Sequence, residues 1–285
     1  METNLLVSVV IPCFNHARYI EEAVRSVCSQ NYRPIELIVI NDGSTDGSLV
    51  ILERLQEELG FRLIDQENQG LTRSVNTGFL NSTGEFFVPF DADDVMLPNR
   101  LELQVKYLLD NPAAGGCGAN FVYINESGEK IPGAKPKKAG SYRFKDFFGE
   151  TGVWLGAPTS IFRRRAIIEA GGYDLDNKIQ DQPMELQVTY AGYTLGITDD
   201  VVTLYRQHGE NMSLNVKKNY SFYEMAIDKY KSEPGYVSAK RGLINSALKW
   251  AVTNDKRFAR YLFSQLPFHS WNRKTFKRLR QYLIK

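Results

Sequence analysis

An acidic pair follows directly after a short hydrophobic segment. Asp91 and Asp93, with Asp94 beside them, come after residues 85–90, which are apolar except for Glu85. Carboxylate oxygens suit Mg²⁺ or Mn²⁺, which in proteins often also bind substrate phosphates. The chain has no G-x-x-x-x-G-K-[ST] loop and no G-x-G-x-x-G turn, the usual backbone cradles for phosphate. The pair therefore predicts a divalent-metal site, through which a diphosphate could be neutralised.

Two other hydrophobic segments also end in polar residues. Asn15 follows residues 6–12, and Asn41-Asp42-Gly43-Ser44 follows residues 35–40. Open α/β sheets bind ligands outside the carboxyl ends of their strands. We therefore expect these side chains to meet the acidic pair at one sheet edge. Taken singly, each segment also fits an ordinary turn or helix cap, where Asn, Asp and Ser are common.

The elements that would position these residues follow from the hydrophobic pattern. Strands alternating with amphipathic helices predict an α/β fold with a mostly parallel sheet and right-handed crossovers. The expected strands are residues 6–12, 35–40, 61–65 and 85–90, and the expected helices are residues 17–30, a segment ending near 59, 71–81 and 98–109. From about residue 221 onward the pattern is helical. We expect a catalytic domain over residues 1–216 and a helical extension over 217–285.

Charge divides the chain at the same place. Residues 1–216 contain 19 Lys and Arg against 29 Asp and Glu, whereas residues 217–285 contain 16 against 4. Between residues 256 and 285, nine basic residues alternate with aromatic and aliphatic ones, and no acidic residue occurs. This composition suits a helix on an anionic membrane surface. A helical bundle or a homodimer contact is the alternative, and the absence of any nucleic-acid-binding motif argues against nucleic acid as a partner.

The remaining composition indicates a cytoplasmic protein. The apolar runs are far shorter than the roughly 20 residues that cross a bilayer, and the first residues do not resemble a signal peptide. Three cysteines, Cys13, Cys28 and Cys117, form no metal-binding pattern and are expected to be free thiols. With the basic extension, the expected location is the cytoplasm or the inner face of the cell membrane.

A series of motifs in fixed order resembles family-2 glycosyltransferases of the GT-A fold. The motifs are VVIPCFN at 9–15, ELIVINDGSTD at 36–46, NQGL at 68–71, FDADD at 90–94, GGYD at 171–174, Asp181, and YRQHGENMS at 205–213. The resemblance covers roughly residues 6–213. It implies a Rossmann-like sheet flanked by helices.

The resemblance also implies a role for each matching residue. The nucleotide would be bound by Pro12, Phe14, Asn15, Asp42, Ser44, Asn68, Arg73 and Asp91. The metal, Mn²⁺ or Mg²⁺, would be bound by Asp93 and His208 with Asp91 close by, and Asp181 would be the catalytic base. The chain departs from the pattern at Gln180, where relatives usually have Glu, and at Val75, where many have Arg.

The implied activity is inverting transfer of a sugar from a nucleotide-sugar, with UDP favoured, to an acceptor hydroxyl. The acceptor would be a glycan or a lipid-linked sugar, as in bacterial surface polysaccharide assembly. A non-catalytic relative of the same fold is one alternative. A sugar nucleotidyltransferase is another, although the Gly-rich signature expected near its first strand is missing. Residues 154–158, which include Trp154, fit either core packing or an acceptor wall.

Overall fold

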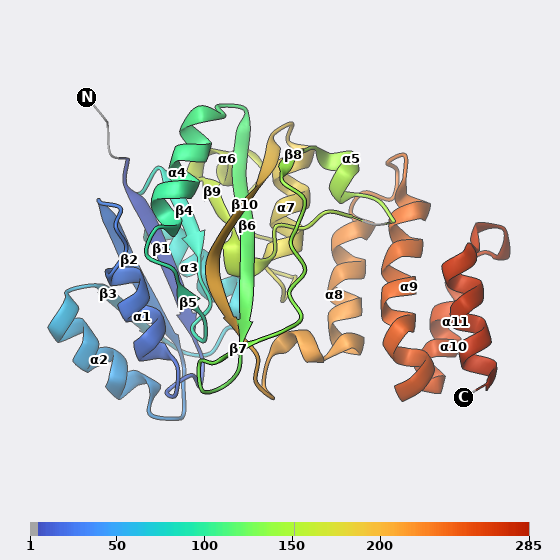
Figure 1. Ribbon diagram of the computed structural model, residues 1–285, viewed down its shortest axis with the longest axis horizontal. Helices are drawn as coiled ribbons and strands as arrows, with labels where there is room; N and C mark the ends of the chain where they lie inside the picture. The colour runs from blue at the N-terminus through green and yellow to red at the C-terminus, as the bar shows by residue number, and fades with distance from the viewer. Residues whose placement is uncertain (1–4, 151, 285) are drawn as a thin grey trace. The chain divides into compact units, whose positions relative to one another are not determined.

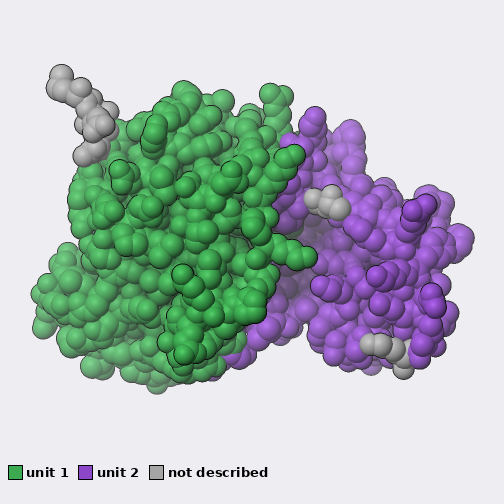
Figure 2. Space-filling view, in the orientation of Figure 1, with its two compact units in different colours: residues 1–143, 155–208 green, residues 144–154, 209–285 purple. Residues whose placement is uncertain are grey.

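The computed structural model describes residues 5–150 and 152–284, which form two compact units (Figure 2). Unit 1 comprises the described residues of 1–143 and 155–208. Unit 2 comprises those of 144–154 and 209–285, so two separate parts of the chain build it. The sequence-based boundary after residue 216 stays a prediction.

Unit 1 is built on one large sheet (Figure 1). Its main path runs β3-β2-β1-β4-β9-β6-β10-β5, with β7 paired to β6 and β8 to β10. The strands are β1 (Val7–Cys13), β2 (Ile35–Asp42), β3 (Arg62–Gln66), β4 (Phe86–Pro89), β5 (Val95–Met96), β6 (Ala114–Ile124), β7 (Lys130–Ile131), β8 (Gly140–Tyr142), β9 (Ile161–Arg163) and β10 (Thr194–Arg206). The first four strands pair in parallel, and β6 pairs in parallel with β10, so the predicted mostly parallel sheet is confirmed.

The antiparallel pairs join the two parallel parts of this sheet and extend its edges. Strand β9 lies antiparallel between β4 and β6, and β5 lies antiparallel to β10. The sequence pattern does not reveal β9, because it has only three residues.

Helices complete unit 1. They are α1 (Ile20–Cys28), α2 (Ser48–Leu59), α3 (Leu71–Leu80), α4 (Arg100–Asp110), α6 (Arg164–Glu169) and α7 (Asp181–Tyr190), together with the 3₁₀ turn η1 (Ala157–Thr159). Every residue of β1 is buried, as its uninterrupted apolar run predicts. Helix α3 lies so close to this strand that a Cβ on Gly78 would stand 2.3 Å from a methyl carbon of Val10.

Unit 2 is helical. Its elements are α5 (Phe144–Phe147), η2 (Met212–Leu214), α8 (Val216–Asp228), α9 (Tyr236–Asn254), α10 (Lys256–Ser264), η3 (Phe268–Ser270) and α11 (Arg273–Ile284). Tyr220, Leu248, Phe258 and Leu262 belong to its core. Many apolar residues of the basic segment therefore pack inside a bundle. No helix among the described residues is long and apolar enough to cross a membrane.

Candidate active site

Three potential metal ligands meet beyond the carboxyl ends of three strands. His16 follows β1, Asp93 follows β4, and His208 follows β10. One ligand atom from each lies within 4.8 Å of the other two. His208 Nε2 is 2.8 Å from Asp93 Oδ2, and both side chains are largely buried. The structure thus brings together the predicted ligands Asp93 and His208 and adds His16.

This donor set fits a divalent transition metal. Two imidazole nitrogens and one carboxylate oxygen suit Mn²⁺ better than Mg²⁺, which prefers oxygen ligands alone. Sequence reasoning missed His16, although its place three residues beyond the first strand was a usable signal. The residues present therefore fit a bound metal ion.

Arg206 fixes the surroundings of these ligands. Its guanidinium is buried, donates from Nε to the Asp93 carbonyl oxygen at 2.8 Å, and forms an ion pair with Glu22 at 2.5 Å. Its backbone N–H donates to Asp94 Oδ1 at 2.9 Å. Because Arg206 ends β10 two residues before His208, it ties the histidine segment to the acidic loop. The sequence placed Arg206 in a motif but assigned it no role.

The two other predicted carboxylates lie in the same electrostatic environment. Burial, with the negative charges of Asp93 and Asp181, raises the pKa of Asp91 to about 7. Burial also raises the pKa of Asp181, whereas backbone hydrogen bonds from Gln182 and Ala157 act in the opposite direction. Asp181 is the first residue of α7, where the helix N-terminus favours a negative charge. Asp91 and Asp181 are therefore near enough to influence each other.

A partly buried cation and a buried carboxylate support the segment beside Asp181. The Glu185 carboxylate accepts from the backbone N–H groups of Leu155 and Gly156, each at 3.2 Å. Lys137 Nζ donates to the Leu155 carbonyl oxygen, and burial lowers the pKa of Lys137 to about 8, against the opposing charges of Glu185 and Asp181. Sequence reasoning missed this pair. Glu185 could have been noticed because it lies one helical turn after Asp181.

Asp42 holds the loop before α3 in place. Its Oδ1 accepts from Gln66 Nε2 at 2.8 Å and from the Gln69 backbone at 2.9 Å, and its Oδ2 accepts from the Gly70 backbone at 2.9 Å. The next residue, Gly43, has a φ of 70°, and a Cβ there would stand 2.7 Å from the Asn68 backbone nitrogen. The predicted residues Asp42 and Asn68 thus border one loop.

Asn15 and Ser44 join the ends of β1 and β2. The Asn15 backbone N–H donates to Ser44 Oγ at 3.1 Å, and Asn15 Oδ1 accepts from the Thr45 backbone at 2.8 Å. Asn15 has a left-handed φ of 58°, a conformation that Asn tolerates better than most residues. Phe14, next to it, is 45% exposed, so part of its ring is accessible to a ligand.

Four residues from the motifs and segments of the sequence analysis have no clear contact with this site. Pro12 is buried within β1. Arg73 is exposed on α3 and has no polar partner among the described residues. The Pro158 carbonyl oxygen accepts from the buried Arg100 at 2.7 Å, which marks Pro158 as part of the core. Trp154 packs against Phe147 in unit 2, with ring centroids 6.0 Å apart.

A comparison with family models tests the family resemblance that the motifs suggested. The model for glycosyl transferase family 2 matches residues 8–172, more than half of the chain. The chain belongs to this family. The matched span includes β1 to β4, the acidic loop and His16, but ends before Asp181 and His208.

Curated relatives of this family-2 chain match over shorter stretches. An uncharacterized glycosyltransferase of Haemophilus influenzae is 36% identical over 139 residues, which are 48% of this chain and 43% of that protein. Glycosyltransferase GlyA of Streptococcus pneumoniae is 34% identical over 123 residues, which are 42% of this chain and 17% of that protein. The chain thus spans less than half the length of these relatives.

Two solved structures share the fold of this family-2 chain. Residues 1–349 of S. aureus TarS in complex with UDP-GlcNAc match with a TM-score of 0.69 at 17% identity, covering 98% of this chain and 81% of that one. The mannosyltransferase PcManGT of Pyrobaculum calidifontis, in complex with GDP-Man and Mn²⁺, matches with a TM-score of 0.66 at 21% identity, covering 99% and 86%. The predicted GT-A fold is confirmed.

Proposed function

We propose that this chain transfers a sugar from a nucleoside diphosphate sugar to an acceptor hydroxyl, with inversion at the anomeric carbon. The observation that carries the proposal is the meeting of Asp93, His208 and His16 beside Asp91 and Asp181. Potential metal ligands and a partly buried carboxylate in one place suit transfer from a diphosphate-activated donor. Family membership and the donor complexes of two structural neighbours support the same class of donor.

The nucleotide would lie along the carboxyl edge of β1 and β2. Phe14 would stack on the base, and Asp42 would accept from a ring N–H with the lone pairs that its loop contacts leave unused. Asn15, Ser44, Pro12 and Asn68 would border the nucleoside, and Arg73 would reach the diphosphate. We favour UDP, because Asp42 as an acceptor suits a uracil ring N–H.

Asp93 and His208 would hold Mn²⁺ or Mg²⁺, with Asp91 directed to the metal or the ribose. A metal held there would supply Lewis acidity and would help to neutralise the charge that develops on the leaving diphosphate. Asp181 then accepts the proton of the acceptor hydroxyl, and the hydroxyl oxygen attacks the anomeric carbon. The bond from that carbon to the donor phosphate oxygen breaks, and its electron pair leaves with the nucleoside diphosphate.

The acceptor and its location form a further part of the proposal. We propose a glycan or lipid-linked sugar acceptor, met at the cytoplasmic face of a membrane as in bacterial surface polysaccharide assembly. Its support is an aromatic cluster in unit 2, formed by the exposed Phe268 and Phe276 and the partly buried Trp271, whose ring centroids lie 5.2 to 6.0 Å apart. Arg273, Lys277 and Arg280 are exposed on the helix that carries Phe276. A homodimer would be the other use of this surface.

One experiment tests the proposed activity. The full chain is incubated with Mn²⁺ and a panel of UDP-, GDP- and dTDP-sugars, and release of the nucleoside diphosphate is followed, with and without simple sugar acceptors. We expect release from one donor and its loss in Asp93→Ala. Donor binding by calorimetry without any turnover would favour a non-catalytic relative. Formation of pyrophosphate from a sugar phosphate and a nucleoside triphosphate would favour a nucleotidyltransferase.

A further inference from the structure

A small pocket in unit 2 lies outside the proposed transfer site. It has a volume of about 250 Å³ and is lined from α9 by Asn245, Ser246 and Lys249, from α11 by Lys274 and Arg278, and by Glu150. This is below the roughly 300 to 1,000 Å³ typical of sites for drug-sized ligands. The volume therefore suits a single small polar group.

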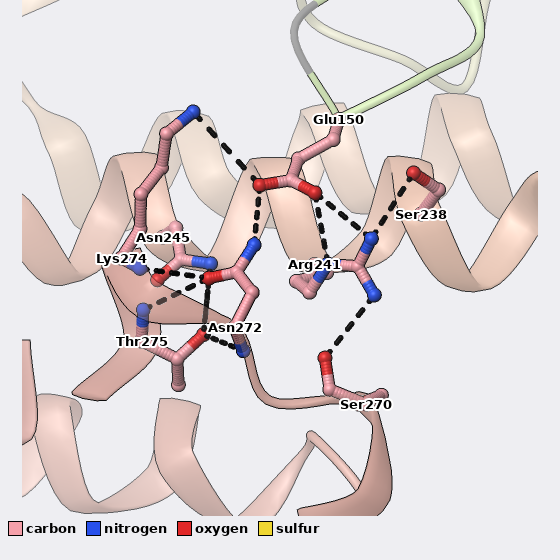
Figure 3. A network of polar contacts seen from close by, with 8 residues as sticks. All are labelled: Glu150, Ser238, Arg241, Asn245, Ser270, Asn272, Lys274 and Thr275. Atoms are coloured by element: carbon pink, nitrogen blue, oxygen red, sulfur yellow. Dashed lines mark hydrogen bonds and ion pairs between the residues drawn. The ribbon is translucent and has the colours of Figure 1, made fainter.

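Positive charge dominates the lining. Glu150 is the only acidic residue among the described lining residues. Its charge is already compensated by Arg241, which is not a lining residue and whose Nε and Nη2 lie 3.0 and 2.8 Å from Glu150 Oε2 (Figure 3). Asn272 Nδ2 also donates to Glu150 at 2.5 Å, whereas Lys274 Nζ lies at a longer 3.8 Å. Lys249 is exposed and forms no ion pair with any described residue. The cations of the lining thus exceed the negative charge they face.

Two of the lining residues each contain one buried polar atom without a hydrogen-bond partner in the described structure: Arg278 Nε and Asn245 Oδ1. Arg278 uses Nη1 to donate to Gln281 at 2.9 Å, which leaves its Nε–H unused. Asn245 is only 6% exposed and donates from Nδ2 to Thr275 Oγ1 at 3.1 Å, which leaves its oxygen unused. Buried polar groups in proteins are nearly always hydrogen-bonded, so a ligand in the pocket would supply the partner that each atom lacks.

We propose that this pocket binds a phosphate ester that carries a free hydroxyl group. The phosphate oxygens accept from Arg278 Nε and from Lys249 Nζ, and the hydroxyl donates to Asn245 Oδ1. Arginine and lysine are the usual phosphate-binding side chains, and the unused amide oxygen provides the acceptor for a neighbouring hydroxyl. A lipid headgroup and a soluble polyol phosphate share this chemistry. The site is separate from the residues of the proposed sugar transfer.

The test measures binding of two probes to the full chain. Glycerol 3-phosphate is titrated by calorimetry, and vesicles of phosphatidylglycerol are compared with vesicles of phosphatidylcholine by co-sedimentation. The pocket variant is Lys249→Gln with Arg278→Gln. The control is Lys218→Gln with Lys231→Gln, which removes the same charge from two exposed residues of unit 2 that lie outside both the lining and α11.

We expect the pocket variant to weaken binding of at least one probe by about tenfold or more, as loss of charge-assisted hydrogen bonds predicts, and the control by less than about twofold. Loss with glycerol 3-phosphate identifies a soluble ester, and loss with vesicles alone identifies a lipid headgroup. Equal weakening in both variants, or no binding of either probe, would overturn the proposal. The single variant Lys249→Gln changes an exposed side chain, so its melting temperature should equal that of the wild type. It must also weaken binding of the same probe. Release of nucleoside diphosphate should be unaffected, which separates this site from the transfer site.

Discussion

His208 Nε2 lies 2.8 Å from Asp93 Oδ2, although 115 residues separate the two in the chain. With His16 they form a set of two potential nitrogen ligands and one potential oxygen ligand for a metal ion. We expect His16→Ala to raise the Mn²⁺ concentration needed for half-maximal nucleoside diphosphate release by about 10- to 100-fold, the range seen when support of a metal site is lost. Saturating Mn²⁺ should restore most of the rate.

His269, in unit 2, provides the matched control, since His269→Ala removes an imidazole far from this ligand set in the sequence. It should leave the Mn²⁺ requirement unchanged. If His16→Ala lowered the rate without changing the Mn²⁺ requirement, His16 would not be a ligand.

Asp181→Asn should remove the base and keep the shape of the site. General-base catalysis contributes about 10²- to 10⁴-fold, so the turnover rate should fall by that factor while the donor binds with nearly the same affinity. Steady-state kinetics and donor calorimetry measure the two quantities separately. A collapse of donor affinity together with the rate would show that Asp181 binds the donor instead.

Gly43→Ala tests the loop beside Asp42. A methyl group there combines a left-handed φ with a clash against the Asn68 backbone, so unfolding free energy should drop by more than about 1 kcal/mol and donor binding should weaken. Gly60→Ala is the matched control, because Gly60 has a φ of 73° and nothing within 4 Å of the added carbon. Equal losses in the two variants would mean that the close approach at Gly43 is unimportant.

Glu185 should make stability depend on pH. Burial, together with the charge of Asp181, raises the pKa of Glu185 from 4.5 to about 8. Between those values the folded state retains a proton that the unfolded chain releases, so the stabilisation is complete below pH 4.5 and is lost as pH rises through 8. The pKa of Lys137 is lowered from 10.5 to about 8, so Lys137 affects stability mainly between pH 8 and 10.5. There the unfolded chain binds the extra proton, and stability rises with pH.

Denaturant unfolding of the wild-type chain and of Glu185→Gln from pH 5 to 7.5 isolates this effect. Relative to the variant, the wild type should lose up to about 1.4 kcal/mol per pH unit. Parallel curves would show that Glu185 is already ionised when folded. Glu169→Gln, an exposed carboxylate of unit 1, is the control and should give a curve parallel to the wild type.

The exposed apolar residues of α11 should contribute to membrane binding. Phe276 is 48% exposed and Leu283 is 72% exposed. Replacing both with Ser should reduce co-sedimentation with anionic vesicles by about tenfold or more. The reason is that partial burial of each apolar side chain in a bilayer stabilises the bound state by about 1 kcal/mol. Val237→Ser with Met225→Ser, two exposed apolar residues of other helices, should have little effect. Wild-type protein that sediments no better with anionic than with neutral vesicles would rule out this surface.

The sequence pattern predicts those parts of the fold that consist of long periodic segments. Strands β1, β2 and β4 and helices α3 and α4 lie within a few residues of their expected positions, because an uninterrupted or regularly spaced apolar pattern is itself the cause of the element. Strand β9 could not be predicted, since three residues have no periodicity and take their conformation from β4 and β6.

The candidate site also has a part that the sequence predicts and a part that it does not. The motif order predicts Asp93 and His208 as metal ligands, and the structure places them side by side, but their role as ligands stays a prediction. His16 and the pair formed by Lys137 and Glu185 depend on contacts between distant segments, which no local pattern encodes. Lys137, for example, donates to the Leu155 carbonyl oxygen 18 residues away from within an irregular loop.

The two-part construction of unit 2 limits how the chain can be divided. Glu150 comes from the short segment 144–154, yet its hydrogen-bonding and ion-pair partners are Arg241, Asn272 and Lys274, from the carboxyl-terminal part. Truncation after residue 216 would leave a carboxylate without the cations that compensate it. It would also leave α5 without the remainder of its unit. The basic extension is therefore not an independent module that could be exchanged between transferases at a single junction, and a chimera would have to carry both segments together.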